Sequence, residues 1–84
     1  MSPRLRLLAV DVDGTLTEER GSYRLSMNAI SAIRELESRG ISVILATGNS
    51  YQIASALTRY LGASWPAIAE NGCVLVDRGS VESL

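Results

Sequence analysis

The stretch "LLAVDVDGTLTEE", Leu7 to Glu19, ends an apolar run with two aspartates one residue apart and then a glycine. The run lacks a clean alternation of apolar and polar residues, which is typical of a strand buried on both faces of a parallel sheet. On a continuing strand, the side chains of Asp11 and Asp13 would lie on the same side. Two close carboxylates repel unless a cation lies between them or one of them holds a proton. The stretch therefore predicts both a parallel sheet and a charged site where its first strand ends.

Four apolar runs bounded by turn residues predict the strands of the sheet. They span Leu5 to Val10, Ile41 to Ala46, Ala67 to Ala69 and Cys73 to Val76. The second run lacks alternation like the first, so we expect both of these strands to be buried on both faces. Gly79 should turn the last strand into a short hairpin.

Two stretches with helical periodicity lie between the first three runs. One begins after Ser26, a favoured N-cap, and ends at Gly40, and the other lies between Ser50 and Gly62. Their apolar stripes are Met27, Ile30, Ile33 and Leu36 in the first and Ile53, Leu57 and Leu61 in the second. The order strand, helix, strand, helix, strand is that of right-handed crossovers in a parallel sheet. We therefore expect an α/β fold with a Rossmann-like, partly parallel sheet, flanking helices and a C-terminal hairpin.

The composition is that of an ordinary globular domain, with 46% hydrophobic and 20% charged residues and a net charge of −1. No block of like charge is present to attract nucleic acid or an anionic membrane. No apolar stretch reaches the ~18 to 20 residues of a membrane span, and we expect a cytoplasmic protein. The 84 residues suit one small domain or a piece of a larger one, because domains more often hold ~100 to 150 residues.

The chain contains no histidine, and its eight basic residues are all arginines. Zinc sites built on histidine are thereby excluded, as are Ser-His and Cys-His nucleophile pairs. No lysine can act as a charge clamp or form a Schiff base. Cys73 is the only cysteine, so it cannot form an internal disulfide, and we expect it to be a small buried apolar residue. Proton transfer by side chains must use carboxylates, tyrosine or cysteine.

The segment from Asp11 to Leu25 is about 15 residues long, whereas loops from strands to helices usually take about 2 to 6 residues. Long loops tend to be functional, and ligands of open parallel sheets bind beyond the carboxyl ends of the strands. The residues that should emerge there are Asp11, Asp13, Thr47 and Glu70. A site with few carboxylates suits Mg²⁺, and a carboxylate beside a metal and a phosphate can act as a nucleophile. Asp13 could pass a proton to a leaving group.

Two loops have features that suit phosphate. Gly14 permits close backbone approach or a positive φ, its turn can cradle an anion, and Thr15 adds a hydroxyl. In "ATGNS", three residues precede the N-terminus of the second helix, where free N–H groups and the helix dipole favour phosphate; they are Thr47, Gly48 and Asn49. We predict that the two loops face each other across adjacent strand ends.

Each motif also has a purely structural explanation. The Asp-Gly pair of the first stretch could be a hairpin turn, and "ATGNS" could only shape a turn and cap a helix. In "AENGCV", Asn71-Gly72 is a strong turn signal and Glu70 could be a solvated charge, which favours structure over function there. No Walker A or G-x-G-x-x-G pattern is present, and the spacing of an EF-hand is not met.

With these residues in place, the chain resembles the first half of a haloacid dehalogenase superfamily phosphatase. "DVDGTLT", Asp11 to Thr17, matches the D-x-D-G-T first motif of that superfamily, and "ILATGNS" matches its second motif, a Ser or Thr that closes a strand. The runs "LSMNAISAIRELESRGISVILATGNS" and "AIAENGCVLV" resemble the cap-bearing branch that includes archaeal-type phosphoglycolate phosphatases and related sugar-phosphate phosphatases.

The resemblance implies a role for each matching residue. Asp11 would attack phosphorus and form a phosphoaspartyl intermediate, while Asp13 would protonate the leaving alcohol and later activate water. Thr47 would hydrogen-bond the phosphoryl oxygens. Mg²⁺ would be held by the Asp11 carboxylate and the backbone carbonyl of Asp13, and backbone N–H groups near Gly14 and Gly48 would also meet the phosphate.

The family also uses a lysine in a third motif and an acidic pair in a fourth, both after the cap. This chain has no lysine, and Glu82 is its only acid after Asp77. We therefore expect residues 1–84 to be the N-terminal part of the core domain, without the cap and the second half of the core, and poorly active or inactive alone. Loss of one well-placed electrostatic group can cost ~10² to 10³ in rate. The first strand should be an unpaired edge, so we expect a homo-oligomer or a complementary chain that covers it.

The sequence thus favours Mg²⁺-dependent hydrolysis of a small phosphorylated metabolite, with 2-phosphoglycolate as the first candidate. The alternative is a non-catalytic fragment that binds phosphate or Mg²⁺, or half of a split enzyme that acts through a partner chain. A phosphoacceptor receiver domain shares the acidic pair and the α/β order, but a separate acceptor aspartate after a later strand is missing here.

Overall fold

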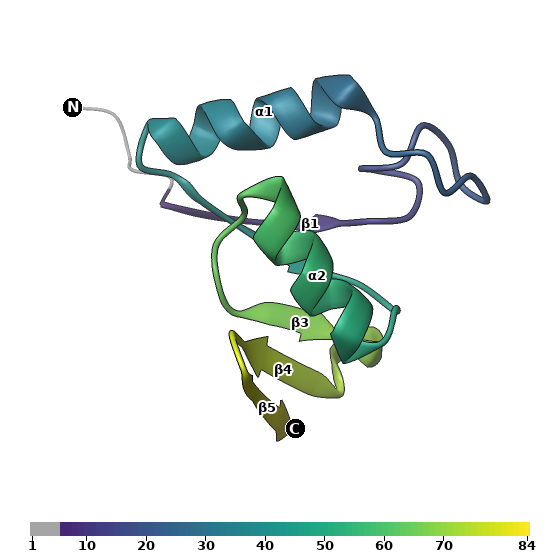
Figure 1. Ribbon diagram of the computed structural model, residues 1–84, viewed down its shortest axis with the longest axis vertical. Coiled ribbons are helices and arrows are strands. Elements are labelled where there is room, and N and C mark those ends of the chain that lie inside the picture. Colours follow the sequence, from purple (N-terminus) through teal and green to yellow (C-terminus); the bar gives the residue numbers. More distant parts are fainter. Residues whose placement is uncertain (1–5) are drawn as a thin grey trace.

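The strands and helices follow the predicted order in the computed structural model, which describes residues 6–84 (Figure 1). They are β1 (Leu7–Asp11), α1 (Met27–Ser38), β2 (Ser42–Ala46), α2 (Tyr51–Leu61), β3 (Ala67–Ala69), the 3-10 turn η1 (Glu70–Gly72), β4 (Val74–Asp77) and β5 (Ser80–Ser83). Leu5, which was predicted to begin the first strand, lies outside the described residues. The other predicted strand ends agree with the structure to within about one residue.

The five strands form one mixed sheet in the order β1-β2-β3-β4-β5. β1, β2 and β3 run parallel, with Ala9 opposite Ile44 and Ala46 opposite Ile68. β4 is antiparallel to β3, and β5 folds back on β4 after the turn that contains Gly79. The parallel sheet is confirmed for the first three strands, and the predicted hairpin is confirmed for the last two.

Both helices pack on the same face of the sheet. Val43 and Leu45 of β2 are fully buried and cluster with Ile33 of α1 and Leu61 of α2. A second cluster joins Ala54 of α2 to side chains of β3 and β4. Two right-handed crossovers that advance in one direction across a sheet place both connecting helices on one side, as Figure 1 shows. Full burial of a Val or Leu side chain contributes ~1.5 to 3 kcal/mol, so this face holds most of the core.

Local signals set the ends of both helices, as predicted. Ser26 Oγ accepts the N–H of Ala29 at 3.2 Å, and Ser50 Oγ accepts the N–H of Ile53 at 3.4 Å. An N-cap of this kind contributes ~1 kcal/mol. Gly62 ends α2 with a φ of 80°, in the left-handed region that glycine adopts at little cost.

β1 is half-exposed, so the prediction that it is buried on both faces is wrong. Leu7 is 54% exposed and Ala9 is also exposed, whereas Leu8 and Val10 are half-buried. The reason is that β1 is an edge of the sheet formed by residues 6–84, and only its face toward the helices joins the core. β2 has a neighbour on each side, and its three central residues are buried, as predicted.

Two apolar side chains of the predicted helical stripes lie outside the core. Met27 is 76% exposed. An α-helix rotates by ~100° per residue, so Met27 lies ~120° around α1 from the buried Ile33. Ile53 is 48% exposed because the buried face of α2 centres instead on Ala54 and Thr58, which are both fully buried. Each helix therefore buries a face rotated away from the first residue of its predicted stripe.

Cys73 is exposed, so its prediction as a small buried residue is wrong. It lies directly before β4, in which Val74 and Val76 face the core. Cys73 itself has a helical backbone conformation, with φ −85° and ψ −17°, and belongs to the exposed turn that ends η1.

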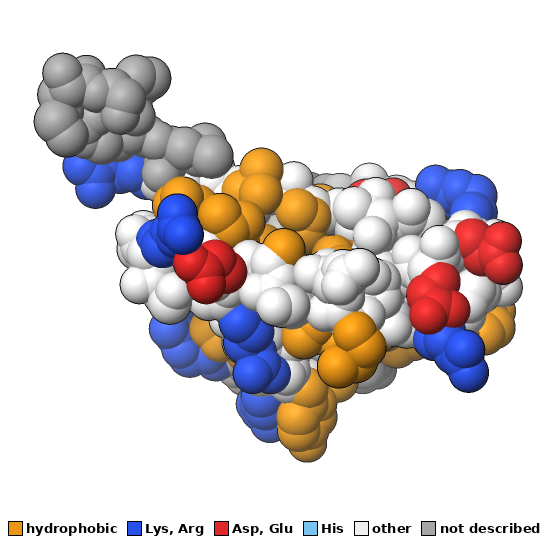
Figure 2. All heavy atoms as spheres, turned by 90° about the horizontal axis from the view of Figure 1, so that it is seen from above, with side chains coloured by type: hydrophobic (Ala, Val, Ile, Leu, Met, Phe, Trp, Pro, Cys, Tyr) orange, Lys and Arg blue, Asp and Glu red, His pale blue; other side chains and the backbone are white. Residues whose placement is uncertain are grey.

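The surface carries charges of both signs close together. Figure 2, which looks onto α1, shows basic and acidic side chains side by side and no extended area of one sign. Within residues 6–84 four ion pairs form, one of them between Arg39 and Glu35 along α1. Among the described helices, none is both long and apolar enough to cross a membrane.

Candidate functional site

The predicted site residues gather where the three parallel strands end. Asp11 is the last residue of β1, Thr47 follows β2, and η1 follows β3. Because these strands are parallel and adjacent, their carboxyl ends meet at one edge of the sheet. A hollow of about 290 Å³ opens there, called the Asp11 hollow below; its lining includes Asp11, Thr47, Gly48, Asn71 and Gly72. The structure thus brings Asp11, Thr47 and Gly48 together, as predicted.

The chain turns sharply after Asp11, so the strand does not continue through Asp13 as the sequence suggested. The carbonyl of Val12 accepts the N–H of Leu16 at 2.8 Å and that of Thr17 at 3.1 Å, and the Val12 side chain is buried in the core. The turn places Asp13 in a separate hollow of about 230 Å³, called the Asp13 hollow, which Thr17 also lines. Asp11 and Asp13 therefore line two separate hollows near the carboxyl ends of the parallel strands.

Gly14 has a φ of +87°, which confirms the positive φ that the sequence allowed. Its N–H donates to Oγ1 of Thr17 at 2.8 Å, so that donor is engaged inside the loop. Thr15 is exposed, and its N–H donates to the carbonyl of Val12 at 3.3 Å. Phosphate binding by Gly14 and Thr15 stays a prediction. Because the N–H of Gly14 is already engaged, the role predicted for Gly14 is to let the backbone approach the ligand closely.

Thr47 is a buried hydroxyl with both of its acceptor positions filled. The side chain is 4% exposed, and Oγ1 accepts the backbone N–H of Asn49 at 3.0 Å and the side-chain Nδ2 of Asn49 at 2.9 Å. A hydroxyl has one hydrogen and two lone pairs. No residue among 6–84 accepts the hydrogen of Thr47, which is therefore available to an acceptor in the Asp11 hollow. An anion is such an acceptor.

Asn49 connects the two hollows. Its Nδ2 donates to Oγ1 of Thr47 and also to Oδ2 of Asp13 at 3.1 Å. A primary amide has two N–H donors, and both have partners here. Asn49 was predicted to bind phosphate. That role stays a prediction; in the structure its amide holds the Asp13 carboxylate at a defined position relative to Thr47.

The turn η1 packs against the "ATGNS" loop, a contact that sequence reasoning missed. The N–H of Asn71 donates to the carbonyl of Thr47 at 3.2 Å, and a Cβ on Gly48 would lie only 2.7 Å from Oδ1 of Asn71. Glu70 accepts the N–H of Tyr51 at 3.2 Å, at the start of α2, so it is more than a solvated charge. The signal available in the sequence was the position of Asn71-Gly72 directly after a strand that ends at the same edge.

Arg20 is a second residue that no motif pointed to. It comes from the long loop after β1, and its Nη2 lies 3.9 Å from Oδ2 of Asp11. The same guanidinium lies over Gly14, with Nη2 3.4 Å from the position that a Cβ on Gly14 would take. The long loop thus returns to the site and places a cation beside the first aspartate.

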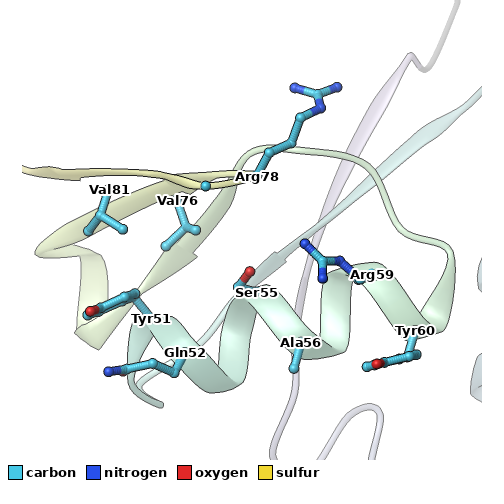
Figure 3. Close-up of a pocket in the computed structure, with 10 residues that line it drawn as sticks. Tyr51, Gln52, Ser55, Ala56, Arg59, Tyr60, Val76, Arg78 and Val81 are labelled. Carbon is cyan, nitrogen blue, oxygen red and sulfur yellow. The ribbon is translucent and has the colours of Figure 1, made fainter.

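A larger hollow of about 390 Å³ lies elsewhere, between α2 and the β4–β5 hairpin (Figure 3). Val76 and Val81 point from the hairpin toward Tyr51, and Arg59 and Arg78 are at its rim. It shares no lining residue with the Asp11 and Asp13 hollows, and no carboxylate lines it. Its size alone does not make it the active site, because the acidic pair lies at the strand ends.

The oxygen atoms of Asp11 and Asp13 are hard ligands of the type that Mg²⁺ prefers. Residues 6–84 contain no group of three or more acidic, histidine or cysteine side chains that could enclose a metal ion. Mg²⁺ commonly takes one or two carboxylates and completes its shell with water and substrate phosphate oxygens. The donor set fits a cation bound in that manner.

Comparisons with known proteins agree with this fold. Residues 8–83 match the family model described as haloacid dehalogenase-like hydrolase. A phosphoglycolate phosphatase of Metallosphaera sedula is 48% identical over 75 residues, which cover 89% of this chain and 34% of that protein. For phosphoglycolate phosphatase 1 of Saccharolobus solfataricus the identity is 49% over 71 residues, which cover 84% and 31%. A crystal structure of a Thermoplasma acidophilum protein superposes with a TM-score of 0.85 at 39% identity, covering 94% of this chain and 35% of that one. The chain spans about a third of the length of these relatives.

Proposed function

The chain belongs to the haloacid dehalogenase-like hydrolases, and from this membership we propose that its site hydrolyses a phosphomonoester through a phosphoaspartyl intermediate on Asp11. The proposed substrate is 2-phosphoglycolate, because the relatives that match at 48% and 49% identity are named phosphoglycolate phosphatases. Since the chain spans about a third of those relatives, the activity is proposed for the site and its rate in this chain is left to experiment.

The observation that carries the proposal is the pairing of Asp11 with Thr47 in one hollow. A carboxylate alone repels a phosphate. The Thr47 hydroxyl, however, already accepts two hydrogen bonds, so it can only donate to the phosphate. The free N–H of Gly48, which has no partner among the described residues, lines the same hollow. Together these donors would hold the phosphoryl oxygens while Asp11 approaches the phosphorus atom.

In the first step, a carboxylate oxygen of Asp11 attacks phosphorus, the bond from phosphorus to the substrate oxygen breaks, and Asp13 gives its proton to the departing alkoxide. In the second step, Asp13 removes a proton from water, and the water oxygen attacks phosphorus. Inorganic phosphate leaves and the Asp11 carboxylate is restored. The hydrogen bond from Asn49 to Asp13 keeps the acid in place for both steps.

Mg²⁺ is proposed as the cofactor, held by the carboxylate of Asp11 and the backbone carbonyl of Asp13. When bound, it would offset the charge of the carboxylate and of the phosphoryl oxygens.

The test is hydrolysis of 2-phosphoglycolate and p-nitrophenyl phosphate in the presence of Mg²⁺, with Asp11→Asn as the active-site variant. Asp77→Asn is the matched control, because Asp77 is an exposed aspartate paired with Arg78 on the distant hairpin. We expect Asp11→Asn to lose at least ~10²-fold in rate and the control to keep the wild-type rate. Activity that survives Asp11→Asn means that the nucleophile is a different residue.

A second candidate function is phosphate or Mg²⁺ binding that becomes catalytic only with a second chain. It is favoured by the position of β1, which is an edge of the described sheet with Leu7 exposed. Unpaired strand edges expose N–H and C=O groups that pair with other chains. We propose that a second copy or a complementary chain covers this edge. A monodisperse monomer by light scattering at high concentration would count against it.

A further inference from the structure

We propose that Arg20 is a substrate-binding residue whose guanidinium donates to the phosphoryl oxygens at the Asp11 hollow. The inference rests on the proposed function and deepens it, because it assigns the basic side chain that, together with the proposed Mg²⁺, meets the anionic group of the substrate.

The guanidinium lies beside Asp11, which lines the Asp11 hollow, and over Gly14 of the turn that follows. Nη2 is 3.9 Å from Oδ2 of Asp11, and Nη2 and Nε are 3.4 Å and 3.5 Å from the position of a Cβ on Gly14. Two nitrogens of one guanidinium therefore lie over the same turn. This flat arrangement of donors suits the two oxygens of a phosphoryl group.

The backbone of Arg20 is tied to the site through a buried threonine. Thr17 is 5% exposed, and its Oγ1 accepts the N–H of Gly14 at 2.8 Å and donates to the carbonyl of Glu19 at 3.1 Å. The N–H of Ser22 donates to the same carbonyl at 3.1 Å and closes a turn with Arg20 inside it. The hydroxyl of Thr17 thus links the glycine beneath the guanidinium to the turn that carries Arg20.

The guanidinium is free to leave Asp11 for a ligand. Arg20 donates no hydrogen bond among residues 6–84, and 3.9 Å is too long for one. Its side chain is 77% exposed and that of Asp11 is 51% exposed, and exposed pairs of this kind contribute little to stability. A structural role therefore does not account for the contact.

The negative charge of the site favours a basic side chain here in addition to the proposed Mg²⁺. The chain contains no lysine and no histidine. Of the ion pairs within the described residues, only that of Arg20 includes Asp11 or Asp13. A phosphate beside the Asp11 carboxylate adds negative charge to a site that already has two acids. Arg20 is the basic side chain placed to offset it.

The test compares Arg20→Ala with Arg24→Ala. Arg24 is a matched control because it lies on the same loop, its side chain is 78% exposed, and its Nη1 is 3.9 Å from an oxygen of Glu18. Both changes remove one positive charge, so they alter the net charge equally. The measurement is the dissociation constant of inorganic phosphate in Mg²⁺ by calorimetry, with thermal unfolding of each variant measured in parallel.

We expect Arg20→Ala to weaken phosphate binding about tenfold, because a charge-assisted pair of hydrogen bonds is lost. Arg24→Ala should stay within about twofold of the wild type, since its exposed charge pairs with Glu18 and is screened by salt. Arg20→Lys should fall between them, because lysine keeps the charge but loses the planar fork.

Equal phosphate affinity of Arg20→Ala and the wild type overturns the inference and leaves the proposed function standing. Equal weakening by Arg20→Ala and Arg24→Ala also overturns it, because the effect is then one of net charge. A wild-type chain that binds no phosphate overturns it as well. The proposed function is then decided separately, by the comparison of Asp11→Asn with the wild type in hydrolysis.

Discussion

Gly48→Ala isolates the contact between the "ATGNS" loop and η1. The φ of Gly48 lies outside the left-handed region, so alanine meets no backbone strain there. The new Cβ would lie 2.7 Å from Oδ1, 3.4 Å from Cγ and 3.6 Å from Nδ2 of Asn71. The first distance is shorter than van der Waals contact allows, so the carboxamide of Asn71 must rotate.

Asn71 is exposed, so its carboxamide can rotate, at a cost of up to ~1 kcal/mol if it leaves its preferred conformation. In a domain of this size, a loss of ~1 kcal/mol lowers the Tm by ~4 to 8 °C. We expect a shift of that order for Gly48→Ala by calorimetry or circular dichroism. Phosphate binding should weaken as well, because Asn71 and Gly48 both line the Asp11 hollow.

A second glycine and a double mutant complete the experiment. Gly79→Ala is the control, because Gly79 also has no positive φ and no atom lies within 4 Å of its added Cβ; its Tm should not fall. In an Asn71→Ala background the cost of Gly48→Ala should disappear, since the clashing atoms are gone. The reasoning is refuted if Gly48→Ala is as harmless as Gly79→Ala, or if its cost is unchanged in the Asn71→Ala background.

Three further predictions concern the loops and a cap. Asn49→Ala removes the hydrogen bond to Asp13, and we expect kcat for phosphoglycolate to fall about tenfold with little change in KM; an unchanged kcat would show that Asn49 does not position the acid. Thr17→Val leaves the N–H of Gly14 without its acceptor, so urea titration should show a loss of ~1 to 3 kcal/mol, and Thr15→Val, at an exposed site, should show none. Ser50→Ala should cost ~1 kcal/mol of unfolding free energy as a lost N-cap; an equal Tm would mean that the cap contributes nothing.

Signals between residues close in the chain predicted the elements well. The N-caps Ser26 and Ser50 and the glycine that ends α2 lie where they were expected, because a cap bonds to a residue three positions away. The β4–β5 hairpin was expected from Gly79 for the same kind of reason. Such signals need no knowledge of the rest of the fold.

Burial was predicted less well, because it depends on neighbours that are distant in the chain. The apolar residues of β1 and β2 look alike in the sequence, yet Leu7 is 54% exposed while Val43 and Leu45 are fully buried. The difference is that β1 lies at an edge of the described sheet and β2 lies inside it. Cys73 lies in the turn before β4 and is exposed, whereas Val74 and Val76 of the strand itself face the core.

The candidate site also has features that the sequence predicts and contacts that depend on distant parts of the chain. The apolar runs of the sequence were enough to place Asp11 and Thr47 at the ends of adjacent parallel strands, and so at one edge of the sheet. Nothing in the sequence indicated that Asn49 bonds to Asp13, that Asn71 lies over Gly48, or that Arg20 returns to Asp11, and these contacts depend on the folded structure. Each of these contacts involves at least one loop, and a loop has no periodicity from which its path can be predicted. The path of the long loop depends on the buried hydroxyl of Thr17, whose partners are known only once the chain has folded.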